Sequence, residues 1–207
     1  MRPLENLLQK YDKLLFVDTE TTGFSSERDR IIELAAITIK PGKTGPYRYR
    51  TYDNFVKLPK YSHVPAKITE LTGITDSDLL LHGEMEQYVA KQFCHMILNE
   101  RTLLIAHNAR FDVKFINAML ERQGNDYFLW QLDYLDTLKV FKDRVPKNHK
   151  LSDAIAHYSL NEVANNSHRA IDDVEALIEV TYAMDREKSN LDTYIQSFDE
   201  LLATKTK

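Results

Sequence analysis

The sequence predicts an α/β fold in which one mixed sheet of five strands is covered by helices on both faces. Three segments at residues 14–19, 31–39 and 47–58 have the apolar or alternating character of strands, and short turns join them. Connections this short allow only antiparallel pairing, so these strands form a meander. After them the apolar period becomes helical, and helices alternate with two further short strands. This order predicts parallel pairing in the second half of the sheet.

Each predicted element has its own signal. Residues 22–26 end the first strand, and a Pro-Gly-Lys-Thr-Gly-Pro turn at 41–46 separates the second from the third. Apolar residues then recur at helical spacing over 89–97, after capping candidates at 78–84. The later elements are a strand at 102–106, a helix at 111–121 that Gly124 ends, a strand near 132–135, helices near 138–142, 151–158 and 171–181, and an amphipathic segment at 191–202.

Composition limits the classes of protein that fit. The 207 residues are 43% hydrophobic and 28% charged, which is typical of a globular chain. No apolar run approaches a membrane span, and no secretory signal is visible, so we expect a cytoplasmic protein without membrane contact. The single cysteine, Cys94, excludes an internal disulfide and a thiolate zinc cluster. We expect one domain over 1–207, with a core of about 12–186 and a C-terminal helix or docking segment at 187–207.

The formal charge of −4 lacks the excess of positive charge with which proteins bind duplex DNA. Bound cations would change this, because divalent ions held by carboxylates reverse the local charge. Affinity for nucleic acid would then come mainly from the metal site itself and from contacts to a few bases bound beside it. A short single-stranded end suits such a site better than a long duplex.

Asp18 and Glu20 lie two residues apart at the end of the first strand. This spacing places both side chains on one face of the sheet. Two carboxylates on an otherwise apolar strand are costly unless a positive charge lies between them, and the ends of strands are where α/β sheets bind ligands. Taken alone, the pair is equally consistent with solvated acids at the end of a strand.

Two further segments place polar residues where helices begin. Asp112 lies in the first turn of its helix, where the dipole favours a negative charge, so a purely structural role is the alternative. Asn108 has the same ambiguity as an N-cap. Asp173 lies beside the apolar stripe of a later helix, and His168 lies on the loop before it. An isolated histidine is more often without a catalytic role.

The segments at 16–23, 107–112 and 168–173 are specific as a set and in this order. Together they resemble the DEDDh family of 3′–5′ exonucleases, and most closely the DnaQ-like proofreading exonucleases of bacterial DNA polymerase III. The resemblance extends over about residues 14–184 and includes 68–75, a segment that recurs between the first two motifs of that group. It implies an RNase H-like fold and stepwise release of nucleoside 5′-monophosphates.

By this resemblance the protein binds two divalent metal ions, Mg²⁺ or Mn²⁺, through Asp18, Glu20, Asp112 and Asp173, with His168 as the general base. Two ions about 3.5–4 Å apart can bind the attacking and leaving oxygens together, and carboxylates suit these ions better than zinc. Histidine has a reference pKa of about 6.5 and can take a proton from water at neutral pH.

The last acid of the set has a neighbour of the same type. The family places four residues between the histidine and the acid, which selects Asp173 and leaves Asp172 as an exposed helix acid.

The resemblance also implies a substrate and its contacts. We expect the 3′ end of a single strand, DNA before RNA, to meet Thr21, Thr22, Gly23, Phe24, His107, Asn108 and Phe111, although ordinary packing is the favoured role of Phe111. One alternative is an exoribonuclease that trims RNA 3′ ends. Another is a nucleic-acid-binding subunit of a polymerase, in which hydrolysis is incidental. A DNA polymerase or a second copy of the chain is the expected partner.

Overall fold

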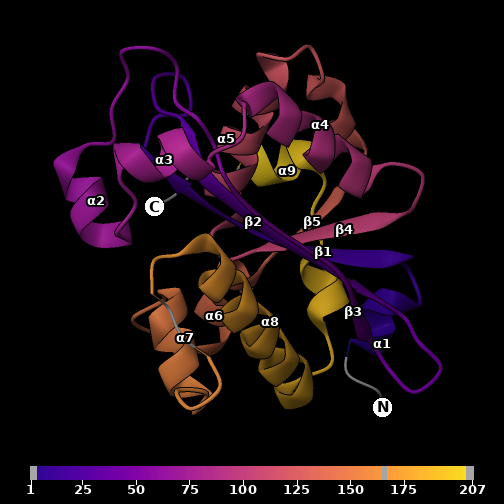
Figure 1. The fold of residues 1–207 in the computed structure, drawn as a ribbon. Coiled ribbons are helices and arrows are strands. Elements are labelled where there is room, and N and C mark those ends of the chain that lie inside the picture. Colours follow the sequence, from indigo (N-terminus) through magenta and orange to yellow (C-terminus); the bar gives the residue numbers. More distant parts are fainter. Residues whose placement is uncertain (1–3, 165–166, 204–207) are drawn as a thin grey trace.

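Five strands form one sheet in the order β3-β2-β1-β4-β5 (Figure 1). The computed structural model describes residues 4–164 and 167–203. The strands are β1 (Lys13–Thr21), β2 (Ile31–Lys40), β3 (Tyr47–Phe55), β4 (Thr102–Ala106) and β5 (Asp133–Asp136). β1, β2 and β3 pair antiparallel, whereas β4 pairs parallel with both β1 and β5. The predicted mixed sheet, with three antiparallel and two parallel strands, is confirmed.

Helices cover both faces of the sheet, as the sequence predicts (Figure 1). On one face lie α1 (Glu5–Leu8), α6 (Thr137–Arg144), α7 (Leu151–His157) and α8 (Ala170–Glu187). On the other lie α4 (Glu86–Ile97), α5 (Ala109–Glu121) and α9 (Phe198–Ala203). Alternate residues of β1 serve the two cores: Phe16 packs on the α8 side, and Val17 packs on the α5 side.

Between β3 and α4 the chain forms two short helices, α2 (Ala66–Thr72) and α3 (Asp76–His82), for which we predicted no helix. They enclose a small apolar cluster that includes Ile32, Ile74 and Leu79. The residues expected to cap α4 belong largely to α3, which Thr75 and Asp78 begin with a reciprocal capping box. The N-cap of α4 is Met85, which makes no side-chain capping bond.

The amphipathic segment predicted at 191–202 is not one helix. It comprises a 3₁₀ turn, η2 (Leu191–Tyr194), followed by α9, with a break between them. At the break Gln196 pairs with Tyr134 of β5 through two backbone hydrogen bonds of 2.9 Å. Phe198 and Leu201 of α9 are buried in the core on the α5 side. Backbone pairing with the sheet therefore outweighs helical continuity here.

Within the described ranges, the helices are too short or too polar to cross a lipid bilayer.

Candidate active site

Asp18 and Glu20 lie near the end of β1 on the face that α8 covers. Both side chains are half-buried, while Val17, Thr19 and Thr21 between and beside them are buried on the opposite face. Asp18 is opposite Ala35 in β2, and the register between β1 and β2 shifts directly after Glu20. The strand thus presents two carboxylates side by side just before the chain turns away.

Asp112 reaches the same end of β1 from the first turn of α5. Its carboxylate is buried, and Oδ1 accepts hydrogen bonds from the Thr19 backbone N–H at 3.0 Å and the Thr19 Oγ1 at 2.8 Å. Because Thr19 lies between Asp18 and Glu20 in the strand, these two bonds bring the helix and its acid to the predicted pair.

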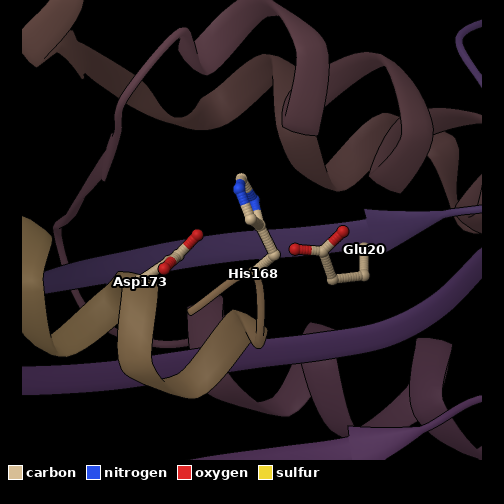
Figure 2. Close-up of side chains that lie close together, drawn as sticks. All are labelled: Glu20, His168 and Asp173. Atoms are coloured by element: carbon tan, nitrogen blue, oxygen red, sulfur yellow. The ribbon is translucent and has the colours of Figure 1, made fainter. Parts of the chain in front are cut away.

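Asp173 and His168 approach from the beginning of α8 (Figure 2). Glu20, His168 and Asp173 each offer one ligand atom, and these atoms lie within 4.8 Å of one another. Asp173 is buried, whereas His168 is exposed and has a backbone φ of 58°. Asp172, predicted to be exposed, is half-buried and accepts a hydrogen bond from the Ser167 hydroxyl.

The gathered carboxylates change one another's titration. Burial, together with the negative charges of Asp112, Asp173, Glu20 and Glu33, raises the pKa of Asp18 well above its usual range. Burial and the same kind of repulsion raise the pKa of Glu20 to about 8. Burial also raises the pKa of Asp112 to about 7, although its bonds from Thr19 act in the opposite direction. Such a group of acids is poised to accept cations.

The turn after Glu20 is fixed by its own hydrogen bonds. The Thr21 hydroxyl donates to the Gly23 carbonyl at 2.6 Å, and the Thr22 hydroxyl accepts from the Arg30 N–H at 2.9 Å. A Cβ on Gly23 would lie 2.5 Å from Oδ2 of Asp29, so a larger residue here would have to displace the Asp29 carboxylate, which accepts from the Ser25 N–H at 2.8 Å. Substrate contact by this turn would therefore come mainly from its backbone.

An aromatic row borders the acids. Phe24 is 91% exposed and meets the half-buried Phe111 edge to face, with ring centroids 6.5 Å apart. Phe111 in turn lies 4.9 Å from the buried Phe115. Phe111 is thus packed as favoured from the sequence, and Phe24 is the aromatic ring that faces solvent.

His107 and Asn108 make contacts with other protein residues beside the site. The Nε2 of His107 lies 2.8 Å from the His149 carbonyl oxygen, and its Nδ1 lies 3.0 Å from the Thr137 hydroxyl. Substrate binding by His107 would have to break one of these contacts. Asn108 is in the N-cap position of α5, but its side chain makes no capping bond; instead its N–H donates to Asp136 at 2.9 Å.

Sequence reasoning missed two charged residues beside the site, Glu33 and Arg169. Glu33 is completely buried, although it interrupts an otherwise apolar strand, and it forms an ion pair with Arg169 at 2.7 Å. A charge within a buried strand is the signal that could have identified Glu33. Asp136 was missed as well: it caps α6 through the Leu138 N–H and also holds the start of α5.

We expect the metal-free protein to lose thermal stability as the pH rises from about 5 to about 8. The pKa values of Glu20 and Asp112 are raised by folding, so in this range the folded state binds more protons than the unfolded chain. Deprotonation then favours unfolding, and the melting temperature measured in EDTA should fall.

Glu20→Gln removes one of the titrating groups, so its melting temperature should fall less steeply and exceed that of the wild type at pH 8. Glu27→Gln changes an exposed acid on the following turn and should behave as the wild type does. A wild-type melting temperature that rises over this range would contradict the electrostatics described above.

Comparison with known proteins identifies relatives over most of the chain. The exonuclease family of RNase T type matches residues 15–181. The PolC-type DNA polymerase III of Clostridium perfringens is 32% identical over 184 residues, which cover 88% of this chain and 12% of that protein. The corresponding enzyme of Oceanobacillus iheyensis is 35% identical over 168 residues, covering 80% and 11%. The chain thus spans about an eighth of the length of these relatives.

Solved structures share the fold at lower sequence identity. Exonuclease I of E. coli in complex with a dA16 oligonucleotide has a TM-score of 0.76 and 21% identity, over 88% of this chain and 42% of that one. Exonuclease I of Methylocaldum szegediense has a TM-score of 0.72 and 21% identity, over 86% and 41%. These structures show that the fold is shared. The family match and the PolC relatives establish that the chain belongs to the DnaQ-like family of 3′–5′ exonucleases.

Proposed function

We propose that this protein is a DEDDh-type exonuclease that removes nucleoside 5′-monophosphates from the 3′ end of single-stranded DNA. The observation that carries the proposal is the approach of four carboxylates and one histidine to one another at the C-terminal end of β1, from β1, α5, α8 and the loop before α8. These residues are Asp18, Glu20, Asp112, Asp173 and His168. We assign catalysis to a core of about residues 12–186, within a single domain.

The acids fit two hard divalent cations. Burial raises the pKa of Asp18, Glu20 and Asp112, and repulsion from neighbouring acids of the site raises those of Asp18 and Glu20 further. A cation among these acids would relieve that repulsion. With Asp173 they form an all-oxygen ligand set, which suits Mg²⁺ or Mn²⁺. When bound, such ions supply Lewis acidity to the scissile phosphate and offset the charge that develops on it.

We assign His168 the role of general base. Its ligand atom lies within 4.8 Å of those of Glu20 and Asp173, and its side chain is exposed. From that position it can take a proton from the attacking water and release it to solvent. Its place on a loop, before α8 begins, allows the ring to adjust when a substrate arrives.

The preference for a single-stranded end rests on Phe24 and on charge. Phe24 is exposed at the edge of the site and is available to stack on a base, a contact that every base can make. The net charge of −4 gives little attraction for duplex away from the site. The structural neighbours in complex with dA16 and dT13 oligonucleotides support a DNA substrate.

The relatives favour attachment to a DNA polymerase over pairing of two copies. They are named as PolC-type DNA polymerase III, and the matched part is about an eighth of their length. We infer that the chain edits or trims 3′ ends in company with a polymerase. Its own residues would supply the hydrolysis, since the full set of acids and the histidine is present.

A matched pair of 5′-labelled oligonucleotides, one DNA and one RNA, tests the substrate. With Mg²⁺ or Mn²⁺ we expect a ladder that shortens from the 3′ end, faster for DNA than for RNA, and no digestion in EDTA. Faster decay of RNA would favour the exoribonuclease alternative, and digestion in EDTA would contradict the dependence on metal.

Asp173→Asn should lower turnover by about 10²-fold or more, because it removes a charge that holds the cations. Asp172→Asn, a change of the same kind one residue earlier, should remain within about threefold of the wild type, since this side chain pairs with Ser167. Rates of 3′-end release under saturating Mg²⁺ measure both. The reverse order would assign the metal-binding role to Asp172.

His168→Ala should lower kcat at neutral pH by about 10²- to 10⁴-fold, the usual contribution of a positioned base. Binding of Mn²⁺, followed by electron paramagnetic resonance, should change little. A variant that no longer binds Mn²⁺ would show that His168 is a ligand.

A further inference from the structure

Glu33, which is buried, and Arg169, which is partly exposed, form a bidentate ion pair between β2 and the beginning of α8. The Arg169 Nε lies 3.0 and 3.2 Å from the two carboxylate oxygens of Glu33, and a terminal nitrogen lies 2.7 Å from Oε1. The Glu33 side chain is 1% exposed and the Arg169 side chain is 39% exposed. The guanidinium thus covers an acid that would otherwise lie buried and uncompensated.

Further contacts orient this pair. The Ala170 N–H, at the first residue of α8, donates to Oε2 of Glu33 at 2.9 Å, so the carboxylate also satisfies a free amide of the helix terminus. The Arg169 guanidinium lies 5.0 Å from the centre of the Phe55 ring of β3. Two strands therefore hold the arginine and the start of the helix at once.

The pair lies directly beside the residues of the site. Arg169 follows His168 in the chain, and Asp173 is one helical turn further on. Glu33 is the cross-strand partner of Glu20. His168 itself has a φ of 58°, a left-handed conformation that residues other than glycine seldom adopt without support from their surroundings. The neighbouring anchor at 169 and 170 is well placed to provide that support.

We propose that Glu33 and Arg169 are positioning residues. Their bidentate pair sets the backbone conformation at His168 and the distance at which Asp173 lies from β1. The inference rests on the proposed exonuclease function for its effect on rate. It does not require that either residue touch the substrate. Both act through the backbone of 168–170, which they join to the sheet.

A simple role in stability would not need this chemistry. Apolar residues in place of a buried ion pair are often as stabilising, so the pair's distinctive property is its geometry. Two guanidinium nitrogens of Arg169 bond to the one carboxylate, which fixes the angle of the guanidinium as well as its distance. A lysine ammonium can supply the charge without that angle. Arg169→Lys therefore separates positioning from charge.

The chain offers a matched control in Arg122 of the α5 C-cap. Arg122 forms a similar fork with Glu86 of α4, with its Nε 3.1 Å from each carboxylate oxygen. This second pair joins α4 to the far end of α5 from Asp112. Arg122→Lys therefore removes a comparable fork without touching the loop that carries His168.

The experiment compares Arg169→Lys and Arg122→Lys with the wild type on single-stranded DNA with Mg²⁺. We expect Arg169→Lys to lower kcat by about 10- to 100-fold, as misplacement of catalytic groups by about 1 Å does, with KM within about threefold. Arg122→Lys should leave both constants near the wild-type values. In Arg169→Ala, added ethylguanidine should restore kcat in part, whereas ethylamine should not.

Amide hydrogen exchange tests the same inference without metal or DNA. The amides of 169–173 should exchange about tenfold faster in Arg169→Lys than in the wild type, and at the wild-type rate in Arg122→Lys. Equal exchange rates at 169–173 in Arg169→Lys and Arg122→Lys would overturn the proposal, as would equal kcat values of these two variants. A raised KM with unchanged kcat would also overturn it, because Arg169 would then be binding substrate.

The kinetic and the hydrogen-exchange measurements separate this inference from the proposed function. If the wild-type protein released no nucleotide from any 3′ end, the exonuclease proposal would be wrong. The exchange measurement would then decide alone whether the pair fixes the loop.

Discussion

The repulsion among carboxylates at the end of β1 is the constraint on which the rest of this structure depends. Burial and neighbouring negative charges raise the pKa of Asp18 and bring that of Glu20 to about 8. Left to themselves, such side chains would separate into water. They stay together because the backbone elements that carry them are fastened to one another. The architecture around the site is therefore best understood as a set of devices that oppose this repulsion.

Each device uses a different part of the chain. β1 is held between β2 and β4, and its pairing with β2 continues through Asp18 and Glu20, so these two residues cannot move away from the sheet. The two bonds from Thr19 hold Asp112, and the carboxylate of Glu33 holds the first amide of α8. Both α5 and α8 begin near the C-terminal end of β1, so the positive ends of their dipoles face the acids. The helices contribute partial positive charge where full charges repel one another.

Local patterns were enough to predict most of the sheet, and the resemblance to the DEDDh family supplied the five residues of the proposed site. The strand at 102–106 was predicted to the residue, because its apolar run has abrupt polar ends. Asp18 and Glu20 were identifiable since their spacing matches the period of a strand. The spacing that the family keeps between its histidine and its last acid selected Asp173 over Asp172, and the structure places Asp173 close to Glu20.

What escaped prediction depends on contacts between distant segments. The bond from Thr19 to Asp112 and the fork from Arg169 to Glu33 join residues 93 and 136 positions apart, and no local pattern encodes them. The break at Gln196 has the same origin, because β5 supplies its hydrogen bonds. Helices α2 and α3 were missed for another reason: they are seven residues each and their apolar faces are short.

The same repulsion links metal and substrate in the proposed function. A polynucleotide end is anionic and would be repelled by the acids of the site, so it can bind well only after cations have reversed the local charge. Linkage makes the effect reciprocal: a strand that prefers the metal-loaded protein must also tighten the hold on the metal, by the same factor. Phe24 stands apart from this coupling, because stacking on a base depends on no charge. Under the proposed function, the site would thus combine one contact with DNA that is independent of metal, made by Phe24, with a group of acids that favour DNA binding only when they hold metal ions.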